Sequence, residues 1–347
     1  MGHSTATKAD RVDWVDYAKG ICIIFVVMMH STLGVEAALG STGWMGDLVA
    51  FAKPFRMPAF FMISGLFIVR TVQQNWVTYL DRKLLHFAYF YILWLSIQFV
   101  LKLPSFTGEY GWSEVLKLYL LSFIEPFGTL WFIYILPLFF ISIKLLHDSK
   151  VPALIAICST IGMQVANVDS GWLVLDNFTQ YFIYFYIGFS FSPLIFKVAS
   201  RVKEQKSLAS LFLVFWAFLN GYLVFYGEDT HPAVSLCLGG LGAIAVVCVS
   251  ALITKARGFA FIRGCGRNSL VIYLSFFFPM AVSRMVLPAI FPSIDVLSAL
   301  VTFSAVCGPL LLWWCIQKYG LGKFLFARPG WAHMRGRGNL QENYEAS

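Results

Sequence analysis

The sequence is dominated by apolar runs of about 20 residues that are separated by short polar linkers. An α-helix of that length crosses the hydrocarbon core of a bilayer, and within lipid only a helix or a closed barrel satisfies its own backbone hydrogen bonds. The runs therefore predict an all-α polytopic membrane protein with about ten transmembrane helices. They lie at 17–38, 48–69, 84–103, 129–146, 151–167, 178–198, 207–226, 233–254, 268–290 and 296–317.

Composition agrees with lipid as the solvent, since 59% of the residues are hydrophobic and only 13% are charged. A soluble domain of this size carries about 25% charged residues. The net charge of +8 does not indicate nucleic-acid binding, because the basic residues lie in short linkers and form no contiguous face with aromatic residues. The seven cysteines form no CxxC pair and show no metal-ligand spacing. We expect them to be small buried apolar residues, and we expect no metal site.

The linkers between the apolar runs alternate in charge. Those at 70–83, 144–150, 201–206 and 255–267 are rich in Lys and Arg, whereas those at 39–47, 168–177, 227–232 and 291–295 contain acidic residues and no Lys or Arg. Basic linkers stay on the cytoplasmic side of the membrane. This asymmetry predicts a multi-pass protein of the plasma (inner) membrane with both termini in the cytoplasm.

The same pattern predicts three regions: a cytoplasmic segment at 1–16, a transmembrane domain at 17–318 and a cytoplasmic tail at 319–347. The first sixteen residues are polar and charged, which argues against a cleavable secretory signal. Residues 112–127 mix Leu and Phe with Glu and Lys, which is typical of an interfacial amphipathic helix. The tail after Phe326 is polar and Gly-rich and is expected to be loosely ordered.

His30 is the first of four ionisable residues that the pattern places at bilayer depth, where charge is costly and often functional. It lies eleven positions after Lys19, about 16 Å farther along the same helix face. Lys19 can reach the cytoplasmic headgroups, which leaves His30 near the midplane. A neutral imidazole there can accept a proton at physiological pH. The alternative is a histidine that only bridges two helices by hydrogen bonds.

The other three are the cations Lys53 and Arg56 in the second run and Arg284 in the ninth. All three are predicted in the outer half of the membrane, and Arg56 at about the depth of His30. Cations that face lipid would be very unfavourable, so we expect them to face a wet central cavity. The alternative is internal pairing, for example with Glu36 or Glu125.

A second basic group, Arg82, Lys83 and His86, opens the third run on the predicted cytoplasmic side. Such a cluster can hold a polyanionic cofactor, although the positive-inside signal alone also accounts for Arg82 and Lys83. Aromatic residues such as Trp131 and Tyr184 are interpreted as packing and interface anchors rather than as ligand contacts.

Several short motifs occur in order along the chain. They are Arg11-Val-Asp-Trp-Val-Asp16-Tyr-Ala-Lys19-Gly with His30 after ten intervening residues, Phe60-Phe61-Met-Ile-Ser64-Gly65-Leu-Phe-Ile68, Arg82-Lys83-Leu-Leu-His86, Leu130-Trp131-Phe132, Phe185-Tyr-Ile-Gly188 and Ser269-Leu-Val-Ile-Tyr273-Leu. From about residue 11 to about residue 315 the chain thus resembles the membrane-bound acyltransferase-3 family, which transfers acyl groups from acyl-CoA to glycans and other acceptors. It departs from the family pattern at Lys19, His86, Tyr89, Leu136 and Phe276.

The resemblance implies an acyl-CoA donor that is bound from the cytoplasm and a hydroxyl acceptor on the other side. Lys19, Arg82, Lys83 and His86 are then expected to hold the CoA phosphates. His30 is expected to act as the general base, or alternatively as an acyl-carrying nucleophile. The depth of Arg56, rather than a motif, suggests that it stabilises the oxyanion.

Acceptor contacts are expected from Lys53, Arg284 and Glu36. Acetyl and succinyl groups are equally compatible with the sequence. The acceptor can be an exopolysaccharide, a periplasmic glucan, a lipid-linked sugar or a small molecule.

Two other functions remain open. A secondary transporter or a flippase of a saccharide or lipid-linked substrate also needs charges around a midplane site. The sequence shows no internal repeat and no paired interrupted helices, which disfavours that reading. A non-catalytic scaffold for envelope assembly would use His30 only for packing.

Overall fold

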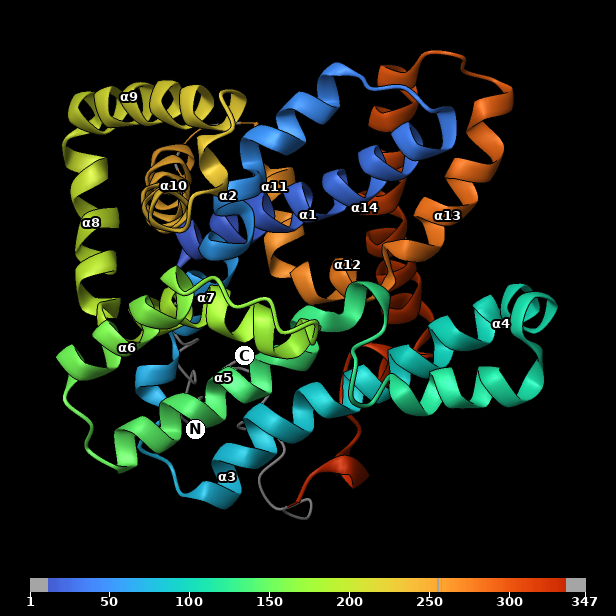
Figure 1. Cartoon of the computed structure of the whole chain (residues 1–347), viewed down its shortest axis with the longest axis horizontal. Coiled ribbons are helices and arrows are strands. Elements are labelled where there is room, and N and C mark those ends of the chain that lie inside the picture. Colours follow the sequence, from blue (N-terminus) through green and yellow to red (C-terminus); the bar gives the residue numbers. More distant parts are fainter. Residues whose placement is uncertain (1–11, 255, 257, 335–347) are drawn as a thin grey trace, which may run out of the picture.

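The computed structural model describes residues 12–254, 256 and 258–334, and within these ranges every regular element is a helix, with no strand. Residues 1–11, which include Arg11 of the first motif, and residues 335–347 of the predicted tail lie outside them. The predicted all-α class is confirmed (Figure 1). The helices are α1 (Asp13–Leu39), α2 (Trp44–Gly65), α3 (Trp76–Leu80), π-helical η2 (Asp81–Leu85), α4 (His86–Leu121), α5 (Trp131–Asp148), α6 (Ala153–Val165), α7 (Leu173–Ser190), α8 (Ser192–Glu204), α9 (Lys206–Phe225), α10 (Pro232–Ile253), α11 (Ala260–Arg267), α12 (Ser269–Ser275), α13 (Phe277–Val286) and α14 (Ile294–Tyr319).

Seven helices in the described ranges are long and apolar enough to cross a membrane, and nine spans result if each of two bent helix pairs counts as one. The run predicted at 151–167 forms α6, which has only 13 residues. A helix of that length extends about 20 Å, less than the hydrocarbon thickness of about 30 Å. The protein is therefore a multi-pass membrane protein, with up to nine of the predicted spans formed at full length.

Two predicted spans are broken. α7 and α8 meet at an angle of 75°, and the helical segment after Ser275 turns by 52° from α12. Each break lies two or three residues before a proline, Pro193 or Pro279, which lacks the N–H that would continue the helical hydrogen bonding. The expectation of unbroken helices at 178–198 and 268–290, and of no paired interrupted helices, was wrong.

α1 lies at the centre of the bundle and contacts α2, α10, α11 and α14, while α2 also packs against α7 and α10 (Figure 1). Glycines allow two of these contacts to be very close. A Cβ atom on Gly188 of α7 would lie 2.0 Å from the Met62 carbonyl oxygen, and one on Gly65 of α2 would lie 2.2 Å from the Phe185 carbonyl oxygen. These motif glycines hold α2 against α7 and so fix the helix that carries Arg56.

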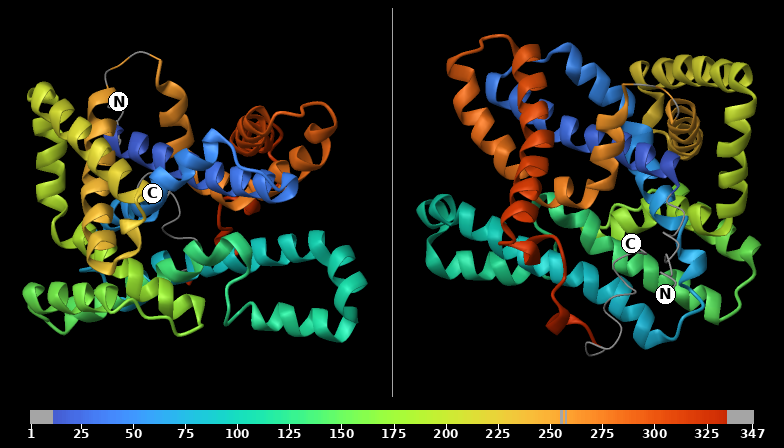
Figure 2. Two further views of the ribbon diagram at one scale, coloured as in Figure 1. Left: turned by 45° about the horizontal axis from the view of Figure 1, so that its top comes forward. Right: turned by 180° about the vertical axis from the view of Figure 1, so that it is seen from behind.

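α4 changes direction at Gly111, whose φ of 75° and ψ of 165° are not helical. The part after Gly111 contains most of the segment that was predicted as an amphipathic helix at 112–127, and it ends at Leu121. The two parts form a hairpin that projects from the rest of the bundle (Figure 2).

Contacts between the linkers reproduce the two groups that the charge pattern predicts. On one face Arg263 pairs with Asp13, and Nε of Arg267 donates to Asp16 over 3.1 Å. On the other face the Trp44 amide donates to Asp295 over 2.9 Å, and Lys53 pairs with Asp229 over 3.2 Å. Linkers of one charge type therefore gather on one side of the bundle.

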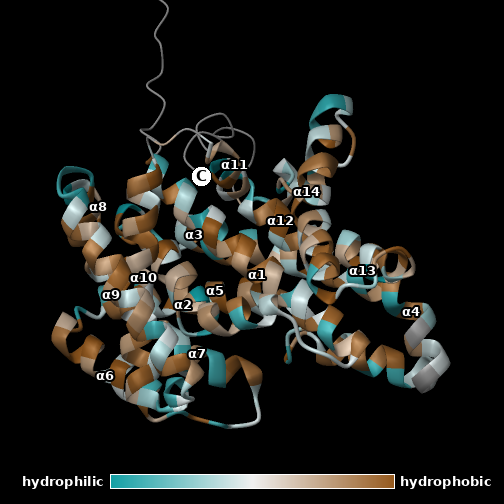
Figure 3. Ribbon diagram, turned by 90° about the horizontal axis from the view of Figure 1, so that it is seen from above, coloured by the Kyte–Doolittle hydropathy of each residue, from teal (hydrophilic) through white to brown (hydrophobic). Residues whose placement is uncertain are grey.

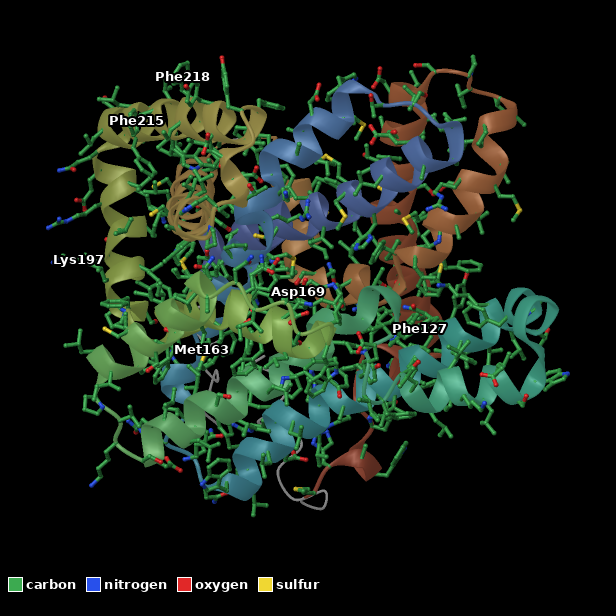
Figure 4. The ribbon with its side chains drawn as sticks, viewed as in Figure 1. Phe127, Met163, Asp169, Lys197, Phe215 and Phe218 are labelled. Carbon is green, nitrogen blue, oxygen red and sulfur yellow. The ribbon has the colours of Figure 1, made fainter. Side chains whose placement is uncertain are left out.

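The outer surface of the bundle is apolar. Phe215 and Phe218 on α9 are 63% and 76% exposed and point away from the other helices (Figure 4). Apolar residues cover most of the helices, and hydrophilic residues gather toward loops and helix ends (Figure 3). Exposed aromatic side chains of this kind suit a lipid environment.

The α2–α7 contact gives a direct test of the packing. Gly188→Ala should lower the free energy of unfolding by about 1–3 kcal/mol, because its Cβ would overlap the backbone of α2. Gly162→Ala on α6, where a Cβ atom meets nothing within 4 Å, is the matched control and should be neutral or stabilise by about 0.5–1 kcal/mol. Thermal unfolding in detergent measures both. Equal stability of the two variants would contradict the described contact.

Candidate active site

His30 on α1 and Arg56 on α2 line the same cavity of about 110 Å³ near the centre of the bundle. The remaining lining residues come from α1, α2, the segment before and at the start of α5, α7 and α12. They are Val26, Met29, Met57, Phe60, Thr129, Trp131, Phe132, Tyr181 and Tyr273. The structure thus brings together the two residues that the sequence analysis predicted as catalytic.

The His30 ring is half-buried and lies against Phe276, with 5.4 Å between the ring centroids and 34° between the planes. Phe276 is the residue at which the α12–α13 pair bends, so the break brings an aromatic ring to the imidazole. Within the described part of the chain His30 forms no hydrogen bond. The alternative of a histidine that bridges two helices by hydrogen bonds therefore finds no support.

Arg56 is only 9% exposed, and its Nε and Nη1 atoms are buried without a hydrogen-bond partner among the described residues. Its guanidinium group interacts electrostatically with His30 and with the Tyr181 phenol, but no acidic residue lines the cavity. Glu36, considered above as a partner, instead accepts a hydrogen bond from the Gly43 amide over 3.0 Å. Arg56 is thus a buried cation whose charge no described side chain balances, which is costly unless a ligand brings negative charge.

The three predicted acceptor contacts lie away from the cavity lining. Arg284 is half-buried and packs on Gly34, one helical turn beyond His30, where a Cβ atom would lie 2.1 Å from its Nη1. The Lys53 side chain is 63% exposed in its pair with Asp229. The Arg284 side chain therefore contacts α1 about one helical turn beyond His30.

The predicted donor-binding residues gather at the basic face. Lys83 interacts electrostatically with both Lys19 and Arg82, and His86 interacts with Lys83. The ammonium group of Lys83 lies 4.7 Å from the centre of the Phe140 ring. Three helical segments, α1, η2 and α4, thus supply one cluster of basic groups.

Four cavity residues that carry polar side-chain atoms were not predicted as functional. The Tyr273 hydroxyl donates to the Thr129 carbonyl oxygen, and the Thr129 hydroxyl is buried without a partner among the described residues. Trp131 and Tyr181 stack with 5.9 Å between centroids and 28° between planes. Trp131 and Tyr273 lie in the motifs quoted above but were interpreted as packing or landmarks. Nothing in the sequence distinguished Thr129 and Tyr181 from ordinary span residues.

Chemically, the cavity combines a base with an uncompensated cation in an apolar setting. An imidazole can take a proton from a hydroxyl group, and a guanidinium group can stabilise the negative charge that develops on an attacked carbonyl oxygen. In the described ranges no group of three or more His, Cys, Asp or Glu residues is placed to hold a metal ion.

Comparison with known proteins relates the chain to one protein family. The acyltransferase-domain model of the acyltransferase-3 family matches residues 12–318. The chain is 25% identical over 227 residues to inner membrane protein YcfT of Escherichia coli. The aligned region covers 58% of this chain and 62% of YcfT. It is also 25% identical over 240 residues to nodulation protein NolL of Sinorhizobium fredii. That aligned region covers 68% of this chain and 63% of NolL. The chain therefore spans less than two thirds of these relatives, and no solved structure matches it.

The unbalanced charge of Arg56 generates a stability prediction. Arg56→Met should raise the free energy of unfolding of the substrate-free protein by about 1–4 kcal/mol, because it replaces an unpaired buried charge by an apolar group of similar length. Arg267→Met is the matched control and should lower it, since Asp16 is left buried without this partner. Thermal unfolding in detergent compares them. A destabilised Arg56→Met protein would show that Arg56 has a structural role.

Proposed function

Because the chain belongs to the acyltransferase-3 family, we propose that it is an integral membrane O-acyltransferase. It moves an acyl group from cytoplasmic acyl-CoA to a hydroxyl group of an extracytoplasmic glycan or another acceptor. The observation that carries the proposal is the shared cavity of His30 and Arg56, with a free imidazole beside an unpaired guanidinium group.

The basic cluster supports a donor site on the cytoplasmic face. Lys19, Arg82 and Lys83 bring positive charge to one place, as the phosphates of CoA require. Lys19 and His30 are separated by about 16 Å along α1. An extended pantetheine arm is comparable in length. A donor held at Lys19 can therefore present its thioester to His30, provided that a passage opens along α1.

At the cavity, His30 removes the proton from the acceptor hydroxyl as its oxygen attacks the thioester carbonyl carbon. The carbonyl oxygen takes the electron pair and becomes an oxyanion, which Arg56 stabilises in a low-dielectric setting. Collapse of this intermediate breaks the C–S bond, and the CoA thiolate leaves with the proton held by His30. The products are an acyl ester and free CoA. An acyl-histidine intermediate is the alternative, with the same net balance.

The acceptor approaches from the opposite face. Of the predicted acceptor contacts, Arg284 of α13 packs on α1 about one turn beyond His30, and Lys53 and Glu36 are the other two. Trp131 and Tyr181 offer flat aromatic faces against which a sugar ring can pack. The segregation of basic linkers, together with the relative that is named an inner membrane protein, supports a plasma-membrane location with cytoplasmic termini.

A transporter or flippase is the second candidate, and the two bent helix pairs favour it, because broken helices often form transport sites. The two functions differ in stoichiometry. An acyltransferase releases one CoA thiol for each ester formed, whereas a transporter moves its substrate without consuming acyl-CoA. Thiol release by the purified protein separates them.

His30 gives the test of the proposed chemistry. In cells that lack the native gene, wild-type protein should restore an acyl-ester mass increment on envelope glycans, and His30→Gln should reduce it by at least about 100-fold, because the general base is lost. Mass spectrometry of the glycans measures the increment, with protein amounts compared after detergent extraction.

The matched control is His231→Gln, which changes an exposed histidine outside the cavity and should leave acylation unchanged. Wild-type acylation by a well-expressed His30→Gln protein would refute the assignment of the base. Absence of any acyl increment with wild-type protein would refute the proposed function itself.

A further inference from the structure

The chain beyond α14 folds back onto the donor face instead of being loose. Residues 320–334, here called the C-terminal strap, lie beside α3 and α4 (Figure 2). The Tyr89 hydroxyl donates to the Phe324 carbonyl oxygen, and Nε1 of Trp94 donates to the Leu325 carbonyl oxygen, both over 2.9 Å. Phe326 packs between Trp94 and Trp313. The expectation of a loosely ordered tail after Phe326 was therefore wrong for residues 327–334.

Arg328 anchors the strap. Its side chain is 2% exposed, and its two terminal nitrogens donate to the Asp81 carbonyl oxygen and the Asp81 carboxylate, each over 2.8 Å. The Met334 amide donates to the other oxygen of the same carboxylate over 2.9 Å, and Nη2 of Arg328 lies 2.6 Å from Nδ1 of His333. A buried, charge-assisted pair with this many bonds fixes geometry strongly.

Asp81 is the first residue of η2, the π-helical turn that carries Arg82 and Lys83. π-helical turns are rare and occur frequently at functional sites. This turn also brings like charges together, so that Lys19 and Arg82 both repel Lys83. The bonds from Arg328 tie this turn to the strap at its first residue.

The strap also meets His86 and Tyr89, two of the positions at which the chain departs from the family pattern. His86 interacts electrostatically with Arg328 and His333, and Tyr89 holds the strap backbone. Two of the five departures from the family pattern thus lie where the strap contacts the bundle.

We propose that the C-terminal strap positions the donor-binding turn, with Arg328 as a positioning residue that acts through Asp81 on Arg82 and Lys83. The inference rests on the proposed function, because it assumes that these basic groups hold the CoA phosphates. The strap contacts η2, α4 and α14, and none of its residues lines the cavity of His30 and Arg56. It therefore sets donor affinity and leaves the cavity chemistry unchanged.

The test uses the full-length protein in detergent, with CoA itself as the probe. Arg328→Ala should weaken CoA binding by about tenfold, a coupling of ordinary size for a bonded pair. At saturating acyl-CoA the maximal rate of thiol release should stay within about twofold of wild type, because His30 and Arg56 are untouched. Arg328→Lys, which keeps the charge, should recover part of the affinity.

A double-mutant cycle checks the pathway. Arg328→Ala and Asp81→Asn both remove the contact between Arg328 and Asp81. The double variant should therefore bind CoA no more weakly than whichever single variant binds it less tightly. Lys117→Ala, which breaks the exposed pair with Glu114 elsewhere on the surface, is the control and should bind CoA like wild type. If Arg328→Ala does not fold, Arg328→Lys and Tyr89→Phe supply the same comparison.

Two outcomes would overturn the inference. Folded Arg328 and Tyr89 variants that bind CoA as tightly as wild type would show that the strap does not act on the donor site. An equal loss of binding and of maximal rate would show a general structural role. Failure of wild-type protein to bind CoA would instead remove the proposed function, and this inference with it.

Discussion

A charged side chain inside an apolar helix bundle is costly unless an opposite charge or hydrogen bonds compensate it. The position of such partners determines where the functional groups of this protein lie. Most buried or half-buried ionic groups meet a partner, as Asp13 and Asp16 do with the arginines of α11 and Asp81 does with Arg328. Arg56 is different, because its buried nitrogens have no partner among the described residues and its neighbour in the cavity is a histidine. Burying this unpaired charge costs free energy. A ligand that develops negative charge beside Arg56 offsets that cost, so its transition state is stabilised.

The rest of the fold holds this arrangement in place. Gly20 and Gly266 let α1 and α11 approach so closely that a Cβ atom on either would overlap the partner backbone. Gly65 and Gly188 do the same for α2 and α7. Because α1 carries His30, α2 carries Arg56 and the two helices also pack against each other, these contacts together hold the two groups in place. Preorganisation of this kind lets a fixed dipole or charge act without reorganising during the reaction.

Sequence alone predicted much of this. Run length and linker charge predicted the spans and their two faces, since both follow from the free energy of moving groups into lipid. His30 and Arg56 were predicted at a similar depth, and both line the same cavity. The bends near Phe191 and Phe276 were missed, because hydropathy does not record a hydrogen bond lost to a proline two or three residues ahead. The strap was missed because a Gly-rich polar segment gains its order from tertiary contacts, here the bonds of Arg328.

The central claim is that one imidazole reaches a donor on one side of the membrane and an acceptor on the other. Sealed inside-out membrane vesicles that contain the protein test it directly, with isotopically labelled acyl-CoA added outside and glycans enclosed within. We expect labelled acyl esters on the enclosed glycans while the vesicles remain sealed to CoA. Esters that form only on the outer side, or inside only after the vesicles leak, would contradict it.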